Sequence, residues 1–395
     1  MSLEILIDAN NQARSLGKIN TTAFALKNPN KWKPEFLRAV LKQYQFLKKL
    51  ETKIPAWFEN KGIIGAEIIN IEQCSSEETG QHKFKNHSGK LALDLTGGFG
   101  VDSYFLAQNF ERLISCEAIS SLQNVVKHNF QNLGISNVEF VNQKAEDFIG
   151  CSNYQFDLIY LDPDRRGENN KKLVLLEDCS PNLVEILPRL LELSPTIIVK
   201  YSPLLDIQLV LKTLSNIRNV EVIAIQNEVK ELLITITDST EHTPVQIVST
   251  NIKKDKTETF SHTIEKENEA FTPFQEPQKY LYEPNAAIMK AGAFKSVAVK
   301  YEVAKIAQHS HYYTSEALIQ DFPGRTFNIE KVLPYSTKAL KPLAKQKFNV
   351  LARNFPLNPV TICKKHHLNT GGDSYLIFTQ NHKNEKIILF CSRTF

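Results

Sequence analysis

The sequence lacks the features that mark secreted, membrane-spanning or metal-stapled proteins. Its six cysteines are scattered, with no CxxC and no regular spacing: Cys74, Cys116, Cys151, Cys179, Cys363 and Cys391. Such cysteines indicate free thiols in a reducing compartment and argue against a zinc site or a disulfide framework. No stretch approaches about 18 uninterrupted apolar residues, and the start MSLEILIDANNQARSLGK has no basic segment followed by an apolar run. We therefore expect a cytoplasmic protein with neither a membrane span nor a signal peptide.

Glycine and proline are also scarce, with 15 and 17 among the 395 residues. The whole composition, with 42% hydrophobic and 23% charged residues, excludes collagen-like, coiled-coil and wholly disordered chains. The composition is typical of a globular chain that can bury a sizeable core. At roughly 100–200 residues per domain, the length suggests two or three domains.

The charge is unevenly distributed along the chain. Residues 1–90 carry 14 Lys/Arg and 9 Asp/Glu (net +5), and residues 91–240 carry 12 and 20 (net −8). Residues 241–321 carry 9 and 11 (net −2), and residues 322–395 carry 12 and 3 (net +9), which together return the total of +4. A basic terminal segment is typical of proteins with a polyanionic partner, although a solvated basic surface has the same composition.

Short apolar runs alternate with helical patterns between residues 90 and 238. The runs predict strands at 91–96, 113–118, 138–142, 156–162, 196–201, 220–225 and 232–237. Near-continuous hydrophobicity suits strands that are covered on both faces, and the alternation with helices predicts a doubly wound α/β domain. Residues 1–90 are predicted to be mostly helical, and the polar stretch 241–277 to be an exposed hairpin or a linker.

The first predicted strand ends in a glycine-rich turn, Asp94-Leu95-Thr96-Gly97-Gly98-Phe99-Gly100. Glycines in such a turn let a ligand approach the backbone N–H groups at a helix N-terminus. The dinucleotide fingerprint G-x-G-x-x-G is incomplete because Ser103 stands at the third glycine, so a nicotinamide-dependent oxidoreductase is disfavoured. The carboxylate of Asp94 would repel a pyrophosphate but attract the amino group of a methionine moiety. Glu117, at the end of the second strand, can accept hydrogen bonds from both hydroxyls of a ribose.

Three segments resemble class I S-adenosylmethionine-dependent methyltransferases: LALDLTGGFGVDSYFLA, CEAISSLQNVVKHNFQNLGI and FDLIYLDPDRRG. The surrounding chain is similar to a bacterial family of RNA methyltransferases with a ferredoxin-like segment and a C-terminal THUMP-like domain. That similarity is carried by IEQCSSEETGQHKFK, by VKYSPLLD and by the tail YEPNAAIMKAG…FPGRTFNIEKVLPYS…ARNFPL…GGDSYLIF.

The resemblance implies an α/β fold: a Rossmann-like, seven-stranded class I methyltransferase domain, with an N-terminal helical region and a small C-terminal α+β domain. It implies S-adenosyl-L-methionine as the cofactor. The predicted boundaries place a mostly helical region at 1–90 and the methyltransferase domain at 91–240, followed by a connecting ferredoxin-like segment at 241–321 and a basic THUMP-like domain at 322–395.

The resemblance also implies roles for residues of the cofactor site. Asp94 would lie near the methionine amino group, Glu117 would hold the ribose with Ala118 beside it, and the turn would be shaped by Thr96, Gly97, Gly98 and Gly100. The Asp-Ala pair that usually flanks the adenine corresponds here to Lys144-Ala145. A lysine cannot accept a hydrogen bond from the adenine amino group, so we expect Glu146, Asp147 or the backbone of Ala145 to make that contact.

The catalytic segment of the resemblance is Asp162-Pro163-Asp164-Arg165-Arg166, where nitrogen-methylating enzymes carry Asn/Asp-Pro-Pro-aromatic. Oxygens of such a segment would accept hydrogen bonds from a target amine and orient its lone pair toward the methyl group, so Asp162, Pro163 and Asp164 are the candidate catalytic residues. Arg165 replaces the aromatic residue, and it could bind substrate together with Arg166 or pair with the many acids of this domain.

The Asp-Pro-x-Arg string also resembles enzymes that methylate carbon 5 of uridine in RNA. Those enzymes need a cysteine nucleophile shortly after the next strand, because a pyrimidine carbon must first be activated by covalent addition. This chain has Lys200-Tyr201-Ser202-Pro203 there, and Cys179 lies one segment earlier. Methylation of a base nitrogen is therefore favoured over methylation of carbon.

Two further positions allow a structural or a functional role. Lys200 could contact a phosphate of the substrate, could hold Asp162, or could form an ordinary structural salt bridge. In Cys74-Ser75-Ser76-Glu77-Glu78-Thr79, Ser75 and Glu78 have the spacing of a helix capping box, while the resemblance implies that this turn and Gln73 close over the cofactor.

The basic C-terminal segment contains candidate RNA contacts at Lys338, Lys341 and Lys345, with further cations at Lys347, Arg353, Lys364 and Lys365. Lysines of this kind give salt-sensitive affinity for phosphates without sequence preference. His366 and His367 lack further ligands at suitable spacing, so no metal is expected. The sequence thus predicts a methyltransferase of RNA, either tRNA or rRNA. The alternatives are a methyltransferase of a small molecule or a protein, and a non-catalytic RNA-binding protein that has kept the fold.

Overall fold

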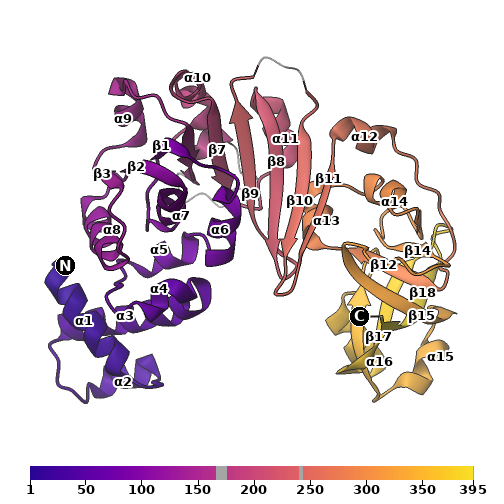
Figure 1. The fold of residues 1–395 in the computed structure, drawn as a ribbon. Coiled ribbons are helices and arrows are strands. Elements are labelled where there is room, and N and C mark those ends of the chain that lie inside the picture. The colour runs from indigo at the N-terminus through magenta and orange to yellow at the C-terminus, as the bar shows by residue number, and fades with distance from the viewer. Residues whose placement is uncertain (166–175, 240–242, 395) are drawn as a thin grey trace. The chain divides into compact units, whose positions relative to one another are not determined.

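The computed structural model describes residues 1–165, 176–239 and 243–394. The chain divides into two compact units, which are treated separately below. The first contains Met1–Arg218 and Glu231–His242, and the second contains Asn219–Lys230 and Thr243–Phe395. Figure 1 shows the elements of both.

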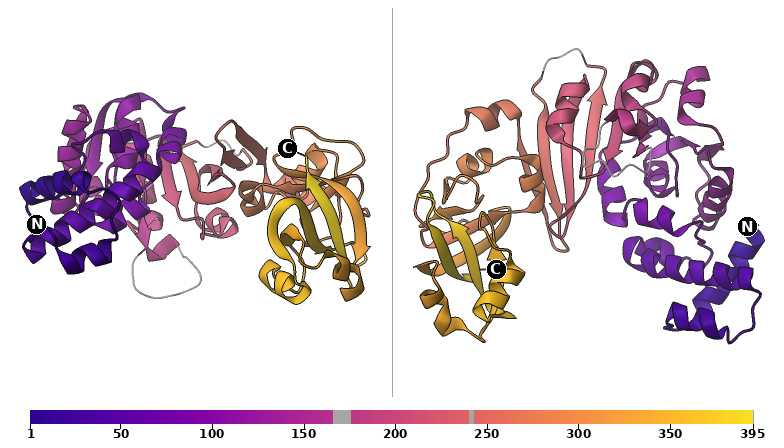
Figure 2. Two further views of the ribbon diagram at one scale, coloured as in Figure 1. Left: turned by 90° about the horizontal axis from the view of Figure 1, so that it is seen from below. Right: turned by 180° about the vertical axis from the view of Figure 1, so that it is seen from behind.

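The first unit begins with a group of helices, as the sequence predicts. They are α1 (Leu3–Ser15), α2 (Thr21–Lys27), α3 (Pro34–Lys53), α4 (Pro55–Glu59), α5 (Ile68–Gln73) and α6 (Glu77–Phe84). In α3, apolar side chains recur at helical spacing, and Val40, Leu47 and Leu50 on that face are buried. The α1 helix packs against α3, and Figure 2 shows α1 to α4 gathered together.

Six strands of the first unit form one layer in the order β9-β7-β4-β1-β2-β3. They are β1 (Gly89–Asp94), β2 (Phe110–Cys116), β3 (Val138–Val141), β4 (Leu158–Leu161), β7 (Thr196–Tyr201) and β9 (Glu228–Thr237). All neighbouring pairs are parallel except β7 and β9. Leu93, Ile114, Ile159 and Ile198 are fully buried in these strands, which accounts for their continuous hydrophobicity.

The remaining elements of the first unit connect these strands. The helices are α7 (Val101–Asn109), α8 (Ser120–Asn132), α9 (Ala145–Cys151), the short 3-10 helix η1 (Leu176–Asp178), α10 (Leu183–Leu193) and α11 (Ile207–Thr213). A two-residue strand β5 (Asp164–Arg165) pairs antiparallel with β6 (Cys179–Ser180). Because the parallel strands all point the same way, the segments that follow β1, β2, β4 and β7 meet at one edge of the sheet.

The N-terminal helices are joined to this sheet by an aromatic cluster. Trp57 of α4 is fully buried, and its ring lies 5.8 Å from Phe99 in the glycine-rich turn, 5.5 Å from Tyr104 and 6.5 Å from Phe130. Phe46 of α3 also packs edge-on against Phe99, at 5.5 Å. The helices of residues 1–90 therefore support the turn that the sequence predicts to hold the cofactor.

The second unit contains a small three-stranded layer in the order β11-β10-β8. Its strands are β8 (Ile217–Ile225), β10 (Gln246–Ile252) and β11 (Thr257–His262), with α12 (Ile264–Glu269) after them. β10 runs parallel to β8 and antiparallel to β11. Of the two possibilities for the polar stretch 241–277, the structure thus has a hairpin over 246–262.

A seven-stranded sheet in the order β13-β14-β12-β15-β18-β17-β16 makes up most of the second unit. Its strands are β12 (Tyr280–Pro284), β13 (Ala304–Lys305), β14 (Tyr313–Ser315), β15 (Gly324–Pro334), β16 (Lys347–Ala352), β17 (Asn369–Gln380) and β18 (Lys386–Arg393). Its helices are α13 (Ala286–Ala291), α14 (Ser296–Lys300), α15 (Thr337–Leu340), the 3-10 helix η2 (Lys341–Leu343) and α16 (Pro359–His366). This is the predicted C-terminal α+β region.

The elements agree with the predicted fold class: a largely parallel α/β sheet with an N-terminal helical region and a C-terminal α+β part. All seven predicted strands are present, although 220–225, within β8, belongs to the second unit. Among the described residues, no helix is both long enough and apolar enough to span a bilayer.

Gly324 gives the first prediction. A Cβ atom at this position would lie 2.0 Å from the backbone oxygen of Glu283, because β15 and β12 approach closely where Gly324 pairs with Pro284. Gly324→Ala should destabilise the chain by about 1–3 kcal/mol, since neither backbone can move without breaking the pairing. Thermal and denaturant melts measure the change. Gly150→Ala is the matched control: no atom lies near that position in α9, and alanine there should be neutral or stabilise slightly. Equal melts for the two variants would contradict this close approach.

Candidate active site

A cavity of about 570 Å³ lies at the sheet edge where the predicted site residues gather. Among its lining residues are ten that the sequence predicts for the cofactor and catalytic site: Thr96, Gly97, Gly98, Gly100, Glu117, Ala118, Ala145, Glu146, Asp162 and Asp164. Asp94 and Pro163, also predicted, are not part of its wall. Gln73 and Cys74, from the segment that the resemblance implies to close over the cofactor, also line the cavity, and so does Asn70 of α5, which the sequence analysis did not name.

The glycine-rich turn needs its glycines for two different reasons. Gly98 and Gly100 have φ angles of +51° and +85°, which side-chain-bearing residues rarely adopt. Gly97 is needed for close approach, because a Cβ atom there would lie 2.6 Å from Ser115 Oγ. Its N–H donates to the carbonyl of Cys116 at 2.7 Å, which ties the turn to the end of β2.

The Asp94 side chain lies beneath the glycine-rich turn and not on the cavity wall. Its carboxylate is fully buried beneath the turn, where Oδ2 accepts a hydrogen bond from Ser103 Oγ at 2.5 Å and Oδ1 accepts one from the Thr96 N–H at 3.0 Å. Burial raises the pKa of Asp94 to about 7, against the opposing effect of these two hydrogen bonds. Asp94 thus organises the turn from below and does not line the cavity, and its predicted contact with a methionine amino group stays a prediction.

Glu117 links the turn to the second strand. Its Oε2 accepts a hydrogen bond from the Gly98 N–H at 3.0 Å, and its Oε1 accepts one from the Ile119 N–H at 2.7 Å. The two bonds fix the carboxylate on the cavity wall, where a ribose could donate to it. Of the alternatives for the adenine contact, Ala145 and Glu146 line the cavity and Asp147 does not.

Asp162 is held from two sides. Its backbone N–H donates to Thr96 Oγ1 at 2.7 Å, and its carboxylate pairs with Lys200 Nζ at 2.5 Å. The Lys200 side chain is only 9% exposed. Although burial alone would lower the pKa of Lys200, the carboxylates of Asp162, Asp102 and Glu231 raise it above its usual value. Of the three predicted possibilities for Lys200, the structure has the one that holds Asp162. The predicted contact of Lys200 with a substrate phosphate stays a prediction.

The rest of the catalytic segment leaves the sheet as β5. Pro163 is buried, and Asp164 lies on the cavity wall with its pKa raised by burial and by the nearby charge of Asp162. Arg165 pairs through its backbone with Cys179 of β6. The side chain of Arg165 and the whole of Arg166 lie outside the described residues, so their predicted substrate contacts stay predictions.

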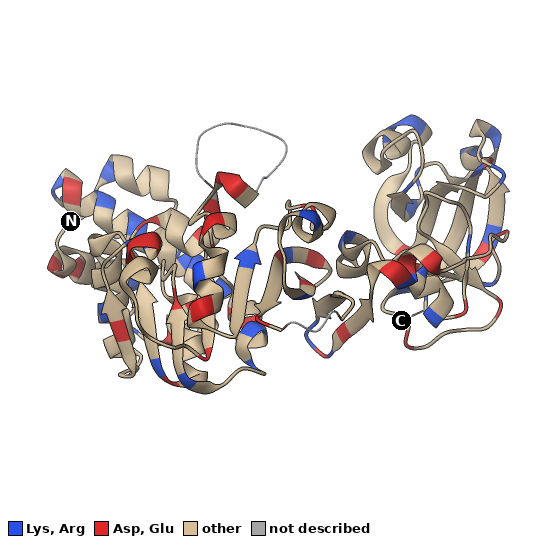
Figure 3. Ribbon diagram, turned by 90° about the horizontal axis from the view of Figure 1, so that it is seen from above, with Lys and Arg blue, Asp and Glu red and all other residues tan. Residues whose placement is uncertain are grey.

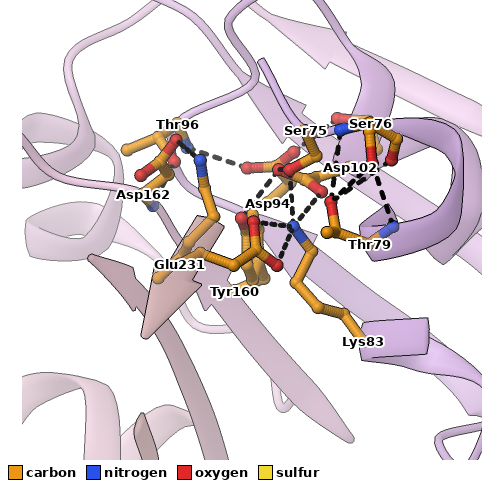
Figure 4. Close-up of polar contacts among 12 residues, drawn as sticks. Ser75, Ser76, Thr79, Lys83, Asp94, Thr96, Asp102, Tyr160, Asp162 and Glu231 are labelled. Carbon is orange, nitrogen blue, oxygen red and sulfur yellow. Dashed lines mark hydrogen bonds and ion pairs between the residues drawn. The ribbon is translucent and has the colours of Figure 1, made fainter. Parts of the chain in front are cut away.

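The structure also contains a buried charge network that the sequence analysis missed. Lys83 Nζ lies 2.8 Å from Asp102 Oδ1, 3.2 Å from Glu231 Oε1 and 2.5 Å from Ser75 Oγ (Figure 4). The capping prediction for this segment is wrong in register, because Ser76 caps α6 and Ser75 is thereby left to contact Asp102 at 2.9 Å. No local signal distinguishes Lys83 from a surface lysine, since its partners lie in other elements.

The thiols nearest the cavity are not activated. Burial raises the pKa of Cys74 to about 11, and it also raises the pKa of Cys116 far above its usual value. Cys179 is buried in β6. The end of β7, where a carbon-methylating enzyme would need its nucleophile, has Lys200 and Tyr201.

The predicted RNA-binding lysines lie in the second unit. Lys338 on α15, Lys341 in η2 and Lys345 after it are all exposed, as are Lys364 and Lys365 on α16. Arg353, by contrast, pairs with Glu283 at 2.8 Å. Figure 3 shows the lysines and arginines of this unit in blue.

Asp94 provides a prediction about pH. The pKa of an aspartate in an unfolded chain is about 3.9, whereas the pKa of Asp94 in the folded chain is about 7. Between these two pH values, the folded chain holds a proton on Asp94 that the unfolded chain has lost. The contribution of Asp94 to stability therefore falls as pH rises, by roughly 1.4 kcal/mol per pH unit in this window. Asp94→Asn keeps an oxygen for the Thr96 N–H and should abolish that slope. Denaturant unfolding of parent and variant from about pH 4.5 to 8 measures the difference, and parallel curves would contradict the buried, protonated carboxyl.

Comparisons with known proteins agree with this architecture. Residues 280–323 match the family of ferredoxin-like domains, and residues 324–393 match the THUMP domain-like family. The crystal structure of a "putative methyltransferase" from Porphyromonas gingivalis W83 is 28% identical, covers 100% of both chains and superposes with a TM-score of 0.89.

Curated relatives are similar to this chain over a smaller part of its length. A tRNA/tmRNA (uracil-C(5))-methyltransferase of Shewanella piezotolerans is 33% identical over 135 residues, which cover 28% of this chain and 36% of the relative. The enzyme of the same name from Photorhabdus laumondii is 31% identical over 125 residues, covering 28% and 32%. The chain thus spans about a third of the length of these relatives. The predicted kinds of domain are confirmed: the chain carries a methyltransferase fold, followed by a ferredoxin-like domain and a THUMP-like domain. The ferredoxin-like match begins at 280, whereas the predicted segment begins at 241.

Proposed function

We propose that the chain is an S-adenosylmethionine-dependent methyltransferase that modifies a base nitrogen in RNA, either tRNA or rRNA. The observation that carries the proposal is the cavity at the sheet edge, whose wall combines the glycine-rich turn with Glu117 and Asp162. The similarity to a methyltransferase structure over the full chain supports the reaction class, and the THUMP-like match and the names of the curated relatives support RNA as the substrate.

The residues present fit the cofactor. Gly98 and Gly100 line the cavity in backbone conformations that favour glycine, and Glu117 offers a fixed carboxylate to a ribose. Ala145 and Glu146 form the part of the wall expected beside the adenine. When bound, the cofactor supplies a methyl group made electrophilic by its attachment to a sulfonium sulfur.

Asp162 is the residue of this chain that would orient the acceptor. The Lys200 ammonium holds its carboxylate at 2.5 Å, and Thr96 holds its backbone at 2.7 Å. A carboxylate fixed in this way can accept a hydrogen bond from an N–H of the target base and direct the nitrogen lone pair toward the methyl group. The same oxygen can receive the proton that the nitrogen releases. Catalysis would then consist mostly of positioning.

A nitrogen target is favoured over carbon 5 of uracil by what stands at the end of β7. Covalent activation of a pyrimidine carbon needs a thiolate nucleophile, and this chain has a lysine-aspartate ion pair there instead. The names of the curated relatives favour methylation of carbon 5 of uracil, but those relatives match over only about a third of their length. Both products are methylated nucleosides of different structure, so one experiment separates them.

That experiment compares methylated nucleosides by mass spectrometry in RNA from a strain lacking the gene and from its parent. Loss of a nucleoside methylated on a base nitrogen supports the proposal, and loss of 5-methyluridine would replace nitrogen by carbon. Identical RNA in the two strains would point to a small-molecule or protein substrate, or to an RNA-binding protein without turnover. We also propose that the protein acts in the cytoplasm, where RNA substrates are present and thiols stay reduced.

Glu117 and Asp162 should separate cofactor binding from chemistry. Glu117→Ala should remove most of the thermal stabilisation by S-adenosylmethionine, which for an intact site is about 2.7 kcal/mol at a hundredfold excess over Kd. Asp162→Ala should keep most of that stabilisation but lower methyl transfer by at least tenfold, because its interaction is strongest in the transition state. Thermal shift and single-turnover transfer measure the two effects, with NAD as the negative ligand. Equal loss of both properties in Asp162→Ala would make it a cofactor or structural residue.

The exposed lysines of the THUMP-like domain should supply RNA affinity that depends on salt. Replacing Lys338, Lys341 and Lys345 together by alanine should weaken RNA binding and reduce the slope of log K against log salt by about 2, since a phosphate that the protein does not neutralise keeps its condensed counterion. The triple replacement by arginine keeps the charge and should keep the slope. Filter binding across a salt series tests both variants. Parent-like binding by the alanine variant would mean that this surface does not contact RNA.

A further inference from the structure

Lys83 is buried beside the cavity although neither the proposed transfer nor the predicted site uses it. Its side chain has no exposed surface, and its ammonium group contacts Ser75, Asp102 and Glu231, which come from three different parts of the first unit (Figure 4). Glu231 lies 148 positions away in sequence. An ammonium group buried this completely requires carboxylate partners, so the positions of Lys83, Asp102 and Glu231 depend on one another.

Asp102 is the member of this network that reaches the cavity. It is the second residue of α7, directly after the glycine-rich turn, and it lines the cavity with 11% of its side chain exposed. Its Oδ2 accepts hydrogen bonds from Ser75 Oγ at 2.9 Å and from the Tyr160 hydroxyl at 2.7 Å. An ionised carboxylate offers about four acceptor positions. Ser75 and Tyr160 fill those of Oδ2, and the buried Oδ1, which lies 2.8 Å from Lys83 Nζ, keeps a position open.

The charges around Asp102 favour a cation in that position. The groups that face it are Lys83 from α6, Tyr160 from β4, Lys200 from β7, Glu231 from β9, and the aspartates Asp94 and Asp162. Two ammonium groups therefore face the three carboxylates Asp102, Glu231 and Asp162, which leaves one negative charge in excess even when Asp94 is protonated. Although burial alone would raise the pKa of Asp102, Lys83 and Lys200 hold it below its usual value.

We propose that Asp102, and not Asp94, is the carboxylate that receives the ammonium group of the cofactor's methionine moiety, and that Lys83 is the positioning residue that keeps it oriented and ionised. The inference rests on the proposed cofactor. It makes the N-terminal helical region part of the cofactor site. Lys83 of α6 balances the charge of Asp102, and Asn70, Gln73 and Cys74 line the cavity. It also accounts for the buried Asp94, whose expected role passes to a residue eight positions later.

The first experiment pairs a protein change with a ligand change. The affinities of S-adenosylhomocysteine and of its analogue without the amino group are measured by calorimetry on the parent and on Asp102→Asn. The parent should prefer the ligand with the amino group by at least tenfold, and Asp102→Asn should lose most of that preference. Asp94→Asn should keep it. An unchanged preference in Asp102→Asn, or its loss in Asp94→Asn instead, would overturn the proposal.

The second experiment tests Lys83 through the pH profile of S-adenosylhomocysteine binding. Because Asp94 itself titrates in this window, the comparison is made in the Asp94→Asn background. There the affinity should stay flat from about pH 5.5 to 8, whereas with Lys83→Met added it should weaken as pH falls because Asp102 then takes up a proton. Lys85→Met, which removes an exposed lysine two residues away, is the matched control and should bind like the parent.

A double variant distinguishes a role of the Lys83–Asp102 ion pair in cofactor binding from a purely structural role. Lys83→Met with Asp102→Asn removes one of the two carboxylates that Lys83→Met leaves without their ammonium partner, and Glu231 is the other. Its melting temperature should therefore recover in part relative to Lys83→Met while its affinity stays low. Recovery of affinity together with stability would show that the ion pair serves only the fold and would overturn the proposal. If the parent itself binds neither S-adenosylmethionine nor S-adenosylhomocysteine, the proposed function fails, an outcome distinct from a parent that binds and an Asp102→Asn variant that binds equally well.

Discussion

Two ammonium groups buried beside one cavity constrain most of the first unit. Removing a charge from water costs several kcal/mol unless an opposite charge compensates it, and losing one partner of such a pair typically costs about 3–5 kcal/mol. Lys83 and Lys200 therefore fix where Asp102, Glu231 and Asp162 must lie. Through them, α6, α7, β4, β7 and β9 are held in one arrangement around the glycine-rich turn. Such pairs stabilise the fold less than apolar packing would, so their value lies in placing carboxylates on a cavity wall.

The same constraint explains why the first 90 residues do not form a separate region. Composition and helical pattern set a boundary near residue 90, but packing crosses it at several places, including the following two. Trp57 lies against Phe99 of the turn, and Lys83 lies against Asp102 at the start of α7. The first compact unit accordingly includes both the helices and the sheet. A boundary drawn from local patterns cannot detect such packing, because neither residue differs locally from an ordinary helix residue.

The features that sequence predicts well here are those determined by neighbours in the chain. Strands follow from apolar runs, the turn from its glycines, and the positions of Glu117 and Asp162 from their places after β2 and β4. What depends on side-chain direction is predicted less well. Asp94 ends β1 as expected, but the pleat and Ser103 direct its carboxyl beneath the turn. Ser75 and Ser76 are adjacent hydroxyls with equal capping chemistry, and the sequence does not show that Ser76 caps α6 while Ser75 contacts Asp102.

The positions of the charged residues in the structure suggest why the charge is unevenly distributed along the chain. In the acidic middle segment, net −8, Asp102, Glu117, Asp162 and Asp164 converge on one cavity wall, while the lysines that balance two of them lie behind it. Such a wall suits a ligand with positive charge, as a sulfonium cofactor is. In the C-terminal segment, net +9, the lysines of α15, η2 and α16 are exposed and suit a polyanion. Under the proposed function, the opposite charges belong to two ligands of opposite charge. After transfer the cofactor product has lost its sulfonium charge, so the acidic wall holds it less strongly than the reactant, and the electrostatics that favour binding also favour release.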